Sequence, residues 1–143
     1  MRTINPYLNF PGNTEEAFNF YKSVFGGEFL TLQRFSDTPD SGNIPEADRN
    51  KIMHVALPIS DGYVLMATDA CESMGFSLTM GTNMYITISP DSKEDATHLF
   101  NGLSAGGKVE MELQDMFWGA YYGSFTDKFG VKWMVNYDSN SKN

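Results

Sequence analysis

The sequence is poor in cysteine, in basic residues and in long apolar runs, and each shortage excludes a class of protein. Its one cysteine, Cys71, cannot form an internal disulfide and suits a reducing compartment, so we expect a cytoplasmic protein. Residues 1–10 lack the apolar core of a signal peptide. No apolar run approaches the roughly 20 residues of a membrane-spanning helix. These features predict a globular domain outside the membrane.

Basic residues are few as well, because 10 Lys and Arg stand against 18 Asp and Glu, for a net charge of −8. A nucleic-acid-binding protein needs a basic stripe, and a protein on an anionic membrane surface needs a basic patch. The scattered Lys and Arg supply neither, so we expect no nucleic acid and no membrane among the partners. The acidity is consistent with solubility alone, or with a cavity that favours cationic ligands.

The common catalytic motifs are missing from the sequence, which has no P-loop, no Cys-x-x-Cys and no Ser-His-Asp arrangement. The glycine pairs at 26–27 and 106–107 follow predicted helices, whereas a glycine-rich cofactor loop follows a strand. Cys71 has no basic neighbour that would activate its thiol. The sequence therefore names no reaction.

What the sequence does contain is an internal repeat. The Gly-Gly pairs recur at an offset of 80 residues, "DGYVLM" recurs as "FGVKWM" at an offset of 68, and "INPYLNF" corresponds to "TNMYITI" at an offset of 78. The residues paired in this way are Met66 with Met134, His54 with Tyr122, Asn5 with Asn83, and Tyr7 with Tyr85. The order of the segments predicts a unit of strand, helix and three strands that is used twice.

Each half has one predicted helix, marked by an apolar stripe at helical spacing. The stripes are Ala17, Phe20, Tyr21, Val24 and Phe25 in the first helix, and Ala96, Leu99, Phe100 and Leu103 in the second. Asn13 with Glu16 predicts an N-cap for the first helix, and Gly26 predicts its end. Pro90 suits the first turn of the second helix.

Apolar and polar residues alternate in the predicted strands, so each sheet has one apolar face for its helix and one mixed face. Two such sheets facing each other would enclose a cup. We therefore predict an α+β fold: one domain over residues 1–143, built from two βαβββ repeats (about 1–69 and 82–138) with a linker at 70–81. The helices lie outside, and the polar segment 36–51 and the linker could cover the mouth of the cup.

The alternation also predicts which side chains point into the cup. In "KIMHVALPI", His54 is out of phase with the apolar residues and is the only inward group suited to proton transfer at neutral pH. A purely structural hydrogen-bonding role is the alternative. His98 lies beside the second stripe, on the surface. Glu110 and Glu112 are out of phase with Met111, so they either form an acidic rim at the mouth or are simply solvated.

Aromatic residues are densest in "DMFWGAYYG", where Phe117 and Trp118 are expected at a turn between strands. Tyr122, the repeat partner of His54, is expected to point inward. Such rings pack in a core or a dimer interface, or they bind a flat or cationic ligand at the mouth of a cup.

The duplicated βαβββ unit resembles the vicinal-oxygen-chelate superfamily, which includes glyoxalase I, bleomycin-resistance proteins and extradiol dioxygenases. Three stretches resemble its PhnB-like branch: "NPYLNFPGNTEEAFNFYKSVFGGE", "IMHVALPISDGYVLMATD" and "LQDMFWGAYYGSFTDKFGVKWMVNY". The resemblance covers nearly the whole chain. It implies the fold predicted above and, because the cups of this superfamily are commonly completed in homodimers, it implies a homodimer.

In metal-dependent members of that superfamily, His, Gln or Glu ligands lie on the first and last strands of each repeat. The resemblance places Asn5, Met66, Tyr85 and Met134 at these positions, and none of the four is a histidine or a carboxylate. Thioether sulfur is a soft ligand that suits copper(I) better than zinc, nickel, manganese or iron. Methionine instead suits an adaptable apolar pocket. We therefore expect no metal cofactor.

Two function classes fit these observations. The first is a small-molecule binding protein without the usual metal site, whose ligand is unknown but cationic or aromatic. The second is an enzyme of the lyase, isomerase or dioxygenase type that uses His54 as its candidate catalytic residue, with an atypical metal or none. The expected ligand-binding residues are Asn5, Tyr7, His54, Met66, Tyr85, Trp118, Tyr122 and Met134.

Overall fold

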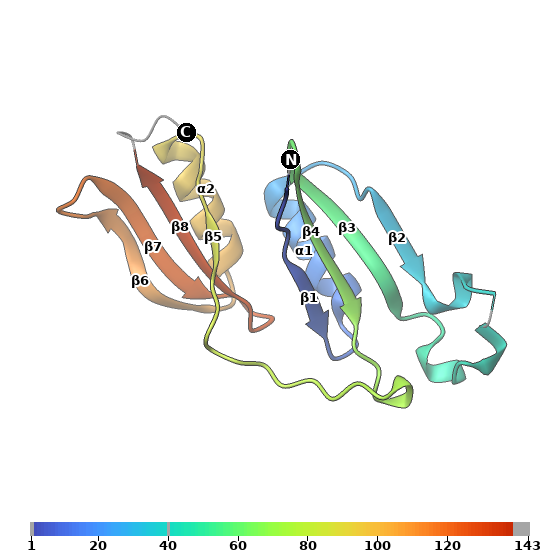
Figure 1. Ribbon diagram of the computed structural model, residues 1–143. Coiled ribbons are helices and arrows are strands. Elements are labelled where there is room, and N and C mark those ends of the chain that lie inside the picture. The colour runs from blue at the N-terminus through green and yellow to red at the C-terminus, as the bar shows by residue number, and fades with distance from the viewer. Residues whose placement is uncertain (1, 40, 139–143) are drawn as a thin grey trace. The chain divides into compact units, whose positions relative to one another are not determined.

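Eight β-strands and two α-helices run through residues 2–39 and 41–138, the part of the chain that this computed structural model describes (Figure 1). The chain divides after Thr79 into two compact units, here called the N-terminal unit and the C-terminal unit. Each unit holds four strands and one helix in the order strand, helix, three strands. The predicted βαβββ arrangement is therefore confirmed in both halves.

The N-terminal unit is a four-stranded mixed sheet with one helix. Its elements are β1 (Tyr7–Phe10), α1 (Thr14–Phe25), β2 (Thr31–Arg34), β3 (Ile52–Ser60) and β4 (Tyr63–Asp69). The strands lie in the order β1-β4-β3-β2, with β1 parallel to β4 and the other neighbours antiparallel. Gly62 closes the β3–β4 hairpin at a φ of 82°, the left-handed conformation that such tight turns require.

The C-terminal unit repeats this arrangement. Its elements are β5 (Ile86–Ile88), α2 (Lys93–Ser104), β6 (Lys108–Asp115), β7 (Ala120–Thr126) and β8 (Lys132–Asp138). The strand order is β5-β8-β7-β6, again with the first strand parallel to the last and the others antiparallel. The α+β fold class is confirmed, while the enclosed cup stays a prediction. Among the described residues, no helix is both long and apolar enough to cross a membrane.

Each helix packs on one face of its own sheet, the closed face, and leaves the other, the open face, without a helix of that unit (Figure 1). The closed faces hold the buried strand residues Phe10, Val55, Leu57, Leu65, Ala67, Phe125, Trp133 and Val135. The alternating residues on the open faces are Tyr7, His54, Ala56, Met66 and Thr68 in the N-terminal unit, and Thr87, Tyr122, Ser124, Lys132, Met134 and Asn136 in the C-terminal unit. Strand alternation therefore predicted the two faces correctly.

The two helical stripes were predicted with different success. In α2, Ala96, Leu99, Phe100 and Leu103 are all buried, as predicted. In α1, Ala17 and Tyr21 are buried as predicted, but Phe18 is fully buried where Phe20 was expected, and Phe20 is only half-buried. The ring of Phe18 packs edge-on against Phe10 and Tyr21, which turns the buried face of the helix toward residue 18.

Both helix starts also differ from the prediction. Asn13 is the N-cap residue of α1, but its side chain caps nothing there. The helix α2 begins at Lys93, and the Ser92 hydroxyl accepts a hydrogen bond from the Asp95 N–H at 3.0 Å, so Pro90 lies outside the first turn. The predicted end of α1 is confirmed, because Gly26 lies at its C-terminus with a φ of 83°.

The strand register corrects one part of the predicted repeat. Tyr7 lies opposite Met66, and Thr87 lies opposite Met134. Because Met66 and Met134 are equivalent, Tyr7 corresponds to Thr87 at an offset of 80, the same offset as the Gly-Gly pairs. The predicted equivalence of Tyr7 with Tyr85 is therefore wrong by two residues, since side-chain identity in a short strand constrains an alignment less than the hydrogen-bond register does.

One buried carboxylate joins three elements of the N-terminal unit. Asp69, at the end of β4 and 1% exposed, accepts hydrogen bonds from the Thr14 N–H at 3.0 Å and the Thr14 hydroxyl at 2.6 Å. Its second oxygen accepts from the Ile52 N–H at 2.8 Å. Asp69 thereby caps the first turn of α1, the role that the sequence assigned to Asn13, and it also favours the helix dipole.

Replacing Asp69 by asparagine should therefore destabilise the protein. The asparagine amide has one oxygen and one NH₂ group, so one of the three groups that donate to Asp69 would face a second donor instead of an acceptor. The free energy of unfolding should fall by about 1–3 kcal/mol. Urea denaturation of Asp69→Asn beside Asp61→Asn, an exposed aspartate in the β3–β4 turn, measures this. Equal stabilities of the two variants would contradict the role of Asp69.

Candidate functional site

The open face of the N-terminal unit carries an aromatic pair built from Tyr7 on β1 and His54 on β3. The Tyr7 hydroxyl lies 3.1 Å from His54 Nδ1, and the two rings are stacked with centroids 5.7 Å apart and planes inclined by 24°. Strand β4 runs between β1 and β3, so the pair reaches across it. Partial burial raises the pKa of the Tyr7 phenol, which keeps it protonated at neutral pH and able to donate to Nδ1.

The residues beneath the pair explain its geometry. Met66 on β4 lies opposite Tyr7 on one side and opposite Ala56 on the other. The small Ala56 side chain leaves room for two rings above the sheet. Tyr7 keeps 47% of its surface exposed, so the pair presents an aromatic platform rather than a buried core contact. Tyr7, His54 and Met66, three of the expected ligand-binding residues, thus lie together.

Asn5 makes a hydrogen bond within the sheet. Its side-chain oxygen accepts a hydrogen bond from the Val64 N–H at 2.9 Å, which extends the pairing of β1 with β4 by one step. An oxygen that is used in this way supports the sheet. Asn5 therefore belongs to the edge of the open face and not to the aromatic platform.

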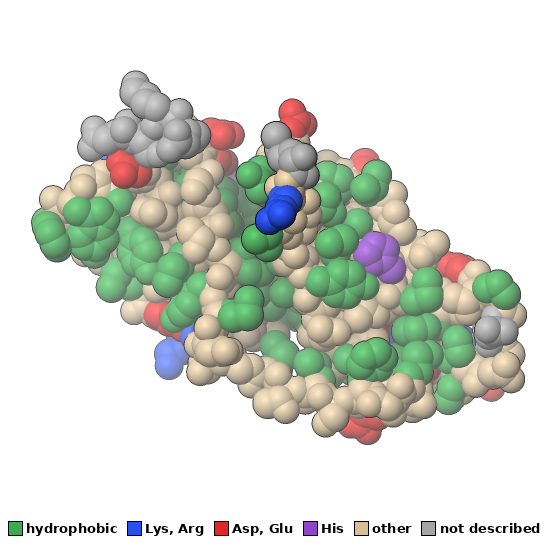
Figure 2. All heavy atoms as spheres, in the orientation of Figure 1, with side chains coloured by type: hydrophobic (Ala, Val, Ile, Leu, Met, Phe, Trp, Pro, Cys, Tyr) green, Lys and Arg blue, Asp and Glu red, His purple; other side chains and the backbone are tan. Residues whose placement is uncertain are grey.

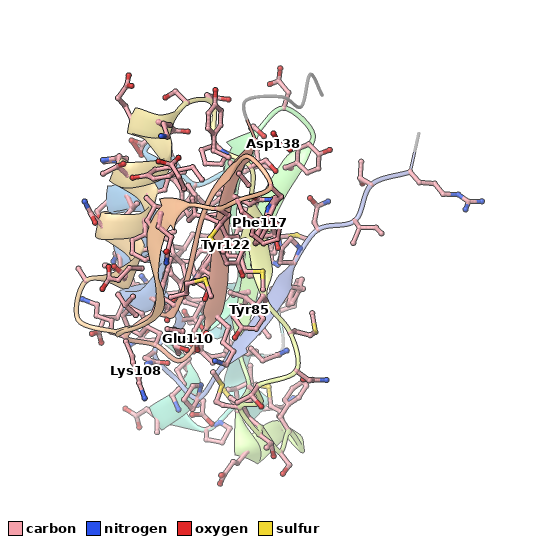
Figure 3. All side chains as sticks on the ribbon, turned by 90° about the vertical axis from the view of Figure 1, so that its left-hand side faces the viewer. Tyr85, Lys108, Glu110, Phe117, Tyr122 and Asp138 are labelled. Carbon is pink, nitrogen blue, oxygen red and sulfur yellow. The ribbon has the colours of Figure 1, made fainter. Side chains whose placement is uncertain are left out.

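The open face of the C-terminal unit carries a row of polar groups that runs across its strands, here called the charged row: Tyr85, Lys132, Thr126 and Glu110. Glu110 accepts hydrogen bonds from the Tyr85 hydroxyl at 2.7 Å, from the Thr126 hydroxyl at 2.9 Å and from the Lys132 ammonium. The Lys132 ammonium also bonds to Thr126 Oγ1 at 3.1 Å and lies 5.1 Å from the centroid of the Tyr85 ring. Figure 3 shows Tyr85 close to Glu110, with Tyr122 and Phe117 farther along the strands.

A β-bulge places Met111 on the same face as Glu110. The pairing of β6 with β7 shifts by one residue between Val109 and Met111, and Met111 lies opposite Ser124 on the open face. Glu110 and Met111 therefore share the open face, and the predicted alternation of the two is wrong. Bulges redirect side chains in this way and are frequent at functional sites.

The charged row stays ionised at neutral pH. The hydrogen bond to Lys132, followed by that to Tyr85, lowers the pKa of Glu110 to about 2. Glu110 in turn raises the pKa of the Lys132 ammonium and that of the Tyr85 phenol. A carboxylate and an ammonium that both hold their charge are suited to binding a ligand and not to exchanging protons with it.

The remaining expected residues also lie in the C-terminal unit. Met134 follows Lys132 by two residues on β8, and its sulfur lies 3.8 Å from the Thr87 hydroxyl. Tyr122 is half-buried on β7, opposite Asn136. Tyr122 also lies opposite Gln114, as His54 lies opposite Gln33, which supports the predicted equivalence of His54 and Tyr122.

Trp118 lies at the turn between β6 and β7, as predicted, where it is 53% exposed and packs edge-on against Phe117 with ring centroids 4.9 Å apart. Phe117 is 96% exposed, so neither ring is part of the core. Hydrophobic side chains are spread over the visible surface of each unit, and Lys and Arg are few (Figure 2). His98 is exposed on α2, as expected.

Cys71 has a basic neighbour after all, which corrects the expectation from sequence. Lys51 lies near it and pairs with Asp48 at 2.7 Å, and the Ser73 hydroxyl donates to Asp48 at 2.5 Å. Burial nevertheless raises the pKa of the Cys71 thiol, and Asp48 adds to the increase. The thiol is therefore not activated, and these contacts fasten the segment 36–51 to its own unit.

The residues at the four metal-ligand positions of the resembled superfamily do not fit a divalent ion. The Asn5 oxygen is held by a backbone N–H, and the Tyr85 hydroxyl donates to Glu110. The other two positions hold the thioethers of Met66 and Met134, which are soft ligands. Within residues 2–39 and 41–138, no group of three or more His, Cys, Asp or Glu is arranged to hold a metal.

Comparisons with known proteins agree on one family. A sequence model of the Glyoxalase/Bleomycin resistance protein/Dioxygenase superfamily matches residues 3–135. Protein YjdN of Escherichia coli K12 is 33% identical over 141 residues, which cover 93% of each chain. The match therefore extends over both units and not over one of them.

Solved structures give the same result. Protein PA1353 from Pseudomonas aeruginosa is 39% identical, with a TM-score of 0.84 over 96% of this chain and 98% of the other. A Bacillus cereus protein described as a putative 3-demethylubiquinone-9 3-methyltransferase, PhnB protein, is 26% identical, with a TM-score of 0.68 over 95% and 99% of the two chains. Its similarity agrees with the resemblance to the PhnB-like branch.

Truncation of a ring on the open face should destabilise the protein less than truncation of a ring on the closed face. Tyr122→Ala removes a half-buried ring from the open face, whereas Phe125→Ala, on the same strand, removes a fully buried ring from the closed face. A buried ring costs about 3–5 kcal/mol when it is truncated to alanine. Urea denaturation should show this loss for Phe125→Ala and a clearly smaller loss for Tyr122→Ala. A similar loss for both would make Tyr122 a core residue.

The ionised state of Glu110 predicts a pH dependence of stability. Folding lowers its pKa from an ordinary 4.5 to about 2, so the stabilisation is complete above about pH 4.5 and is lost as the pH falls toward 2. Glu110→Gln should therefore be less stable than the natural protein at pH 7, and the difference should narrow between pH 4.5 and pH 2.5. Urea midpoints at these pH values test this.

Glu112→Gln is the matched control for this series, because Glu112 is an exposed carboxylate on the same strand. Its stability relative to the natural protein should change little over the same pH range. If the difference in stability between Glu110→Gln and the natural protein stays constant from pH 7 to pH 2.5, the proposed ion pair of Glu110 with Lys132 is contradicted.

Proposed function

The chain belongs to the glyoxalase/bleomycin resistance protein/dioxygenase superfamily, and we propose that it binds a small molecule on the open faces of its sheets without a metal ion. The observation that carries the proposal is the platform of Tyr7 and His54. The two rings are stacked, and 47% of the Tyr7 surface is exposed to solvent. A flat ligand that stacks on the rings would bury this apolar surface and so gain binding free energy.

The chemistry of the expected residues supports this proposal. Met66 lies beside the platform and Met134 lies on the other open face, and the flexible, polarisable methionine side chain adapts to ligands of different shape. The oxygen atoms of Asn5 and Tyr85 are engaged in hydrogen bonds within the protein. The donor set that would hold a divalent ion in related proteins thus has other uses in this chain.

An enzyme of the same superfamily is the second candidate, and one observation favours it. The Tyr7 hydroxyl lies within hydrogen-bond distance of His54 Nδ1 at 3.1 Å, and the two rings are stacked, which orients the imidazole. A ligand on the platform would therefore meet a histidine whose orientation is fixed, as a general acid or base requires. The reaction would be of the lyase, isomerase or dioxygenase type, and the fold does not choose among them.

The homodimer stays a prediction. The exposed rings of Phe117 and Trp118 and the exposed Tyr63 would supply apolar contacts for a second copy. A cytoplasmic location likewise stays an expectation from the sequence.

The proposal predicts two results for the purified full-length chain. Metal analysis should find no stoichiometric divalent ion, and a chelator should leave the melting temperature unchanged, since a structural metal would contribute several kcal/mol to folding. A thermal-shift screen of flat aromatic compounds, neutral and cationic, should yield compounds that raise the melting temperature.

Tyr7→Leu should weaken the binding of such a compound about two- to tenfold, because ring stacking contributes about 0.5–1.5 kcal/mol. Tyr63→Leu is the matched control, a tyrosine that is 60% exposed and lies outside the platform, and should leave the affinity unchanged. One tightly bound ion per chain with His54 among its ligands, or equal effects of the two variants, would overturn the proposal.

A further inference from the structure

The charged row is not required by the fold, because the other unit does without it. The register equates Lys132 and Thr126 with Val64 and Pro58 in the N-terminal unit. The offset of 80 residues that equates Tyr7 with Thr87 and Thr31 with Met111 places Tyr85 with Asn5 and Glu110 with Leu30. Those four residues are uncharged, and the same sheet forms around them. A partly buried ion pair on an open face costs desolvation. The charged row is therefore not explained by the stability of the sheet, and we look for its role in ligand binding.

The hydrogen bonds of the row show which group is left to bind a ligand. Three donors hold the Glu110 carboxylate: Tyr85, Thr126 and Lys132. The Lys132 ammonium can donate three hydrogen bonds, of which Glu110 and Thr126 accept two. The third N–H has the Tyr85 ring beside it. Glu110 thus acts as the support, and Lys132, whose side chain keeps 13% of its surface exposed, has one N–H beyond those that Glu110 and Thr126 accept.

The charges of the row select the ligand. Glu110 and Lys132 neutralise each other, so the row offers no net charge. A cation would be repelled by the ammonium and would find three hydrogen bonds already made to the carboxylate. An anion would be repelled by Glu110. A neutral oxygen acceptor, such as an amide or ketone carbonyl, can take the N–H without either penalty. This differs from the cationic ligand that the acidic composition suggested.

The neighbouring positions suit an apolar body attached to that oxygen. Met134 lies two residues from Lys132 on the same strand and face, about 7 Å away along the strand. Met111 lies across β7 on the same face, opposite Ser124. The two methionines therefore offer an apolar surface on the face that carries the Lys132 ammonium, which suits a ligand with an aromatic ring and a carbonyl group.

We infer that the open face of the C-terminal unit binds a neutral carbonyl compound, with its oxygen on Lys132, its apolar body on Met134, and Glu110 as the residue that excludes anions. This inference rests on the proposed function and names the chemical class of the ligand for one of the two open faces.

The test compares benzamide, benzoate and benzylamine, which share a ring and differ in the charge of the polar group. Binding is followed by NMR of methyl-labelled methionine, with the Met134 and Met66 signals assigned by leucine substitution. In the natural protein, benzamide should shift the Met134 signal with an affinity at least about fivefold above that of benzylamine and of benzoate, a difference of about 1 kcal/mol.

Two substitutions separate the roles of the charges. Lys132→Met keeps the length of the side chain and should weaken benzamide about tenfold, whereas Lys132→Arg should retain binding. Glu110→Gln leaves the positive charge of Lys132 unopposed, so benzoate should overtake benzamide. Glu112→Gln, on the same strand, should leave the order of the three probes unchanged. Dispersed methyl signals show that each variant is folded.

The outcomes keep the two proposals apart. If benzylamine binds as well as benzamide, or if Lys132→Met leaves benzamide binding unchanged, the inference is wrong, while aromatic binding at the Met66 or Met134 signals would still support the proposed function. If none of the probes shifts the Met134 signal, the inference is also wrong. The proposed function is then judged by the platform variant Tyr7→Leu in the separate screen.

Discussion

Each sheet of this protein has four strands but only one helix of its unit to pack against, and this constraint determines the rest of the structure. The helix covers one face and buries residues such as Phe18 and Phe100, whose rings pack against the strands. The open face receives no such cover from its own unit, so it holds side chains that tolerate partial exposure: tyrosine, histidine, methionine, and a charged row in which Glu110 accepts three hydrogen bonds. The candidate sites are therefore a consequence of the layer arrangement and not additions to it.

The two repeats share a backbone but have diverged on their open faces. The closed faces remain alike because both must pack a helix, whereas the open faces are free of that demand. The N-terminal unit places Tyr7 on its first strand, where the C-terminal unit has Thr87, and the C-terminal unit places Lys132 where the N-terminal unit has Val64. One open face is thus an aromatic platform with a fixed histidine, and the other is a row of opposite charges. Two units with the same strand order can in this way carry different functional groups on their open faces.

The fold and the faces could be predicted from the sequence because strand alternation and helical stripes report burial directly. The details that failed depend on long-range contacts. Asn13 has the residue type of an N-cap, but its side chain caps nothing. Asp69 takes that role by accepting hydrogen bonds from Thr14, which lies 55 residues earlier in the chain. Short strands carry too few residues to fix their alignment, so Tyr7 was matched to the wrong partner. These errors concern partners that only tertiary structure brings together.

The most informative failure is the β-bulge in β6, because it created part of the candidate site. Strict alternation separates Glu110 from Met111, and only the extra residue in the strand lets both lie on the open face. No residue in "KVEMELQD" announces a bulge, since it contains neither glycine nor proline. Alternation alone brings the Glu110 carboxylate to Lys132, a partly buried lysine, and the bulge adds the Met111 side chain to the same face. The apolar part of this candidate site thus depends on an irregularity of backbone pairing, and not on the residue types alone.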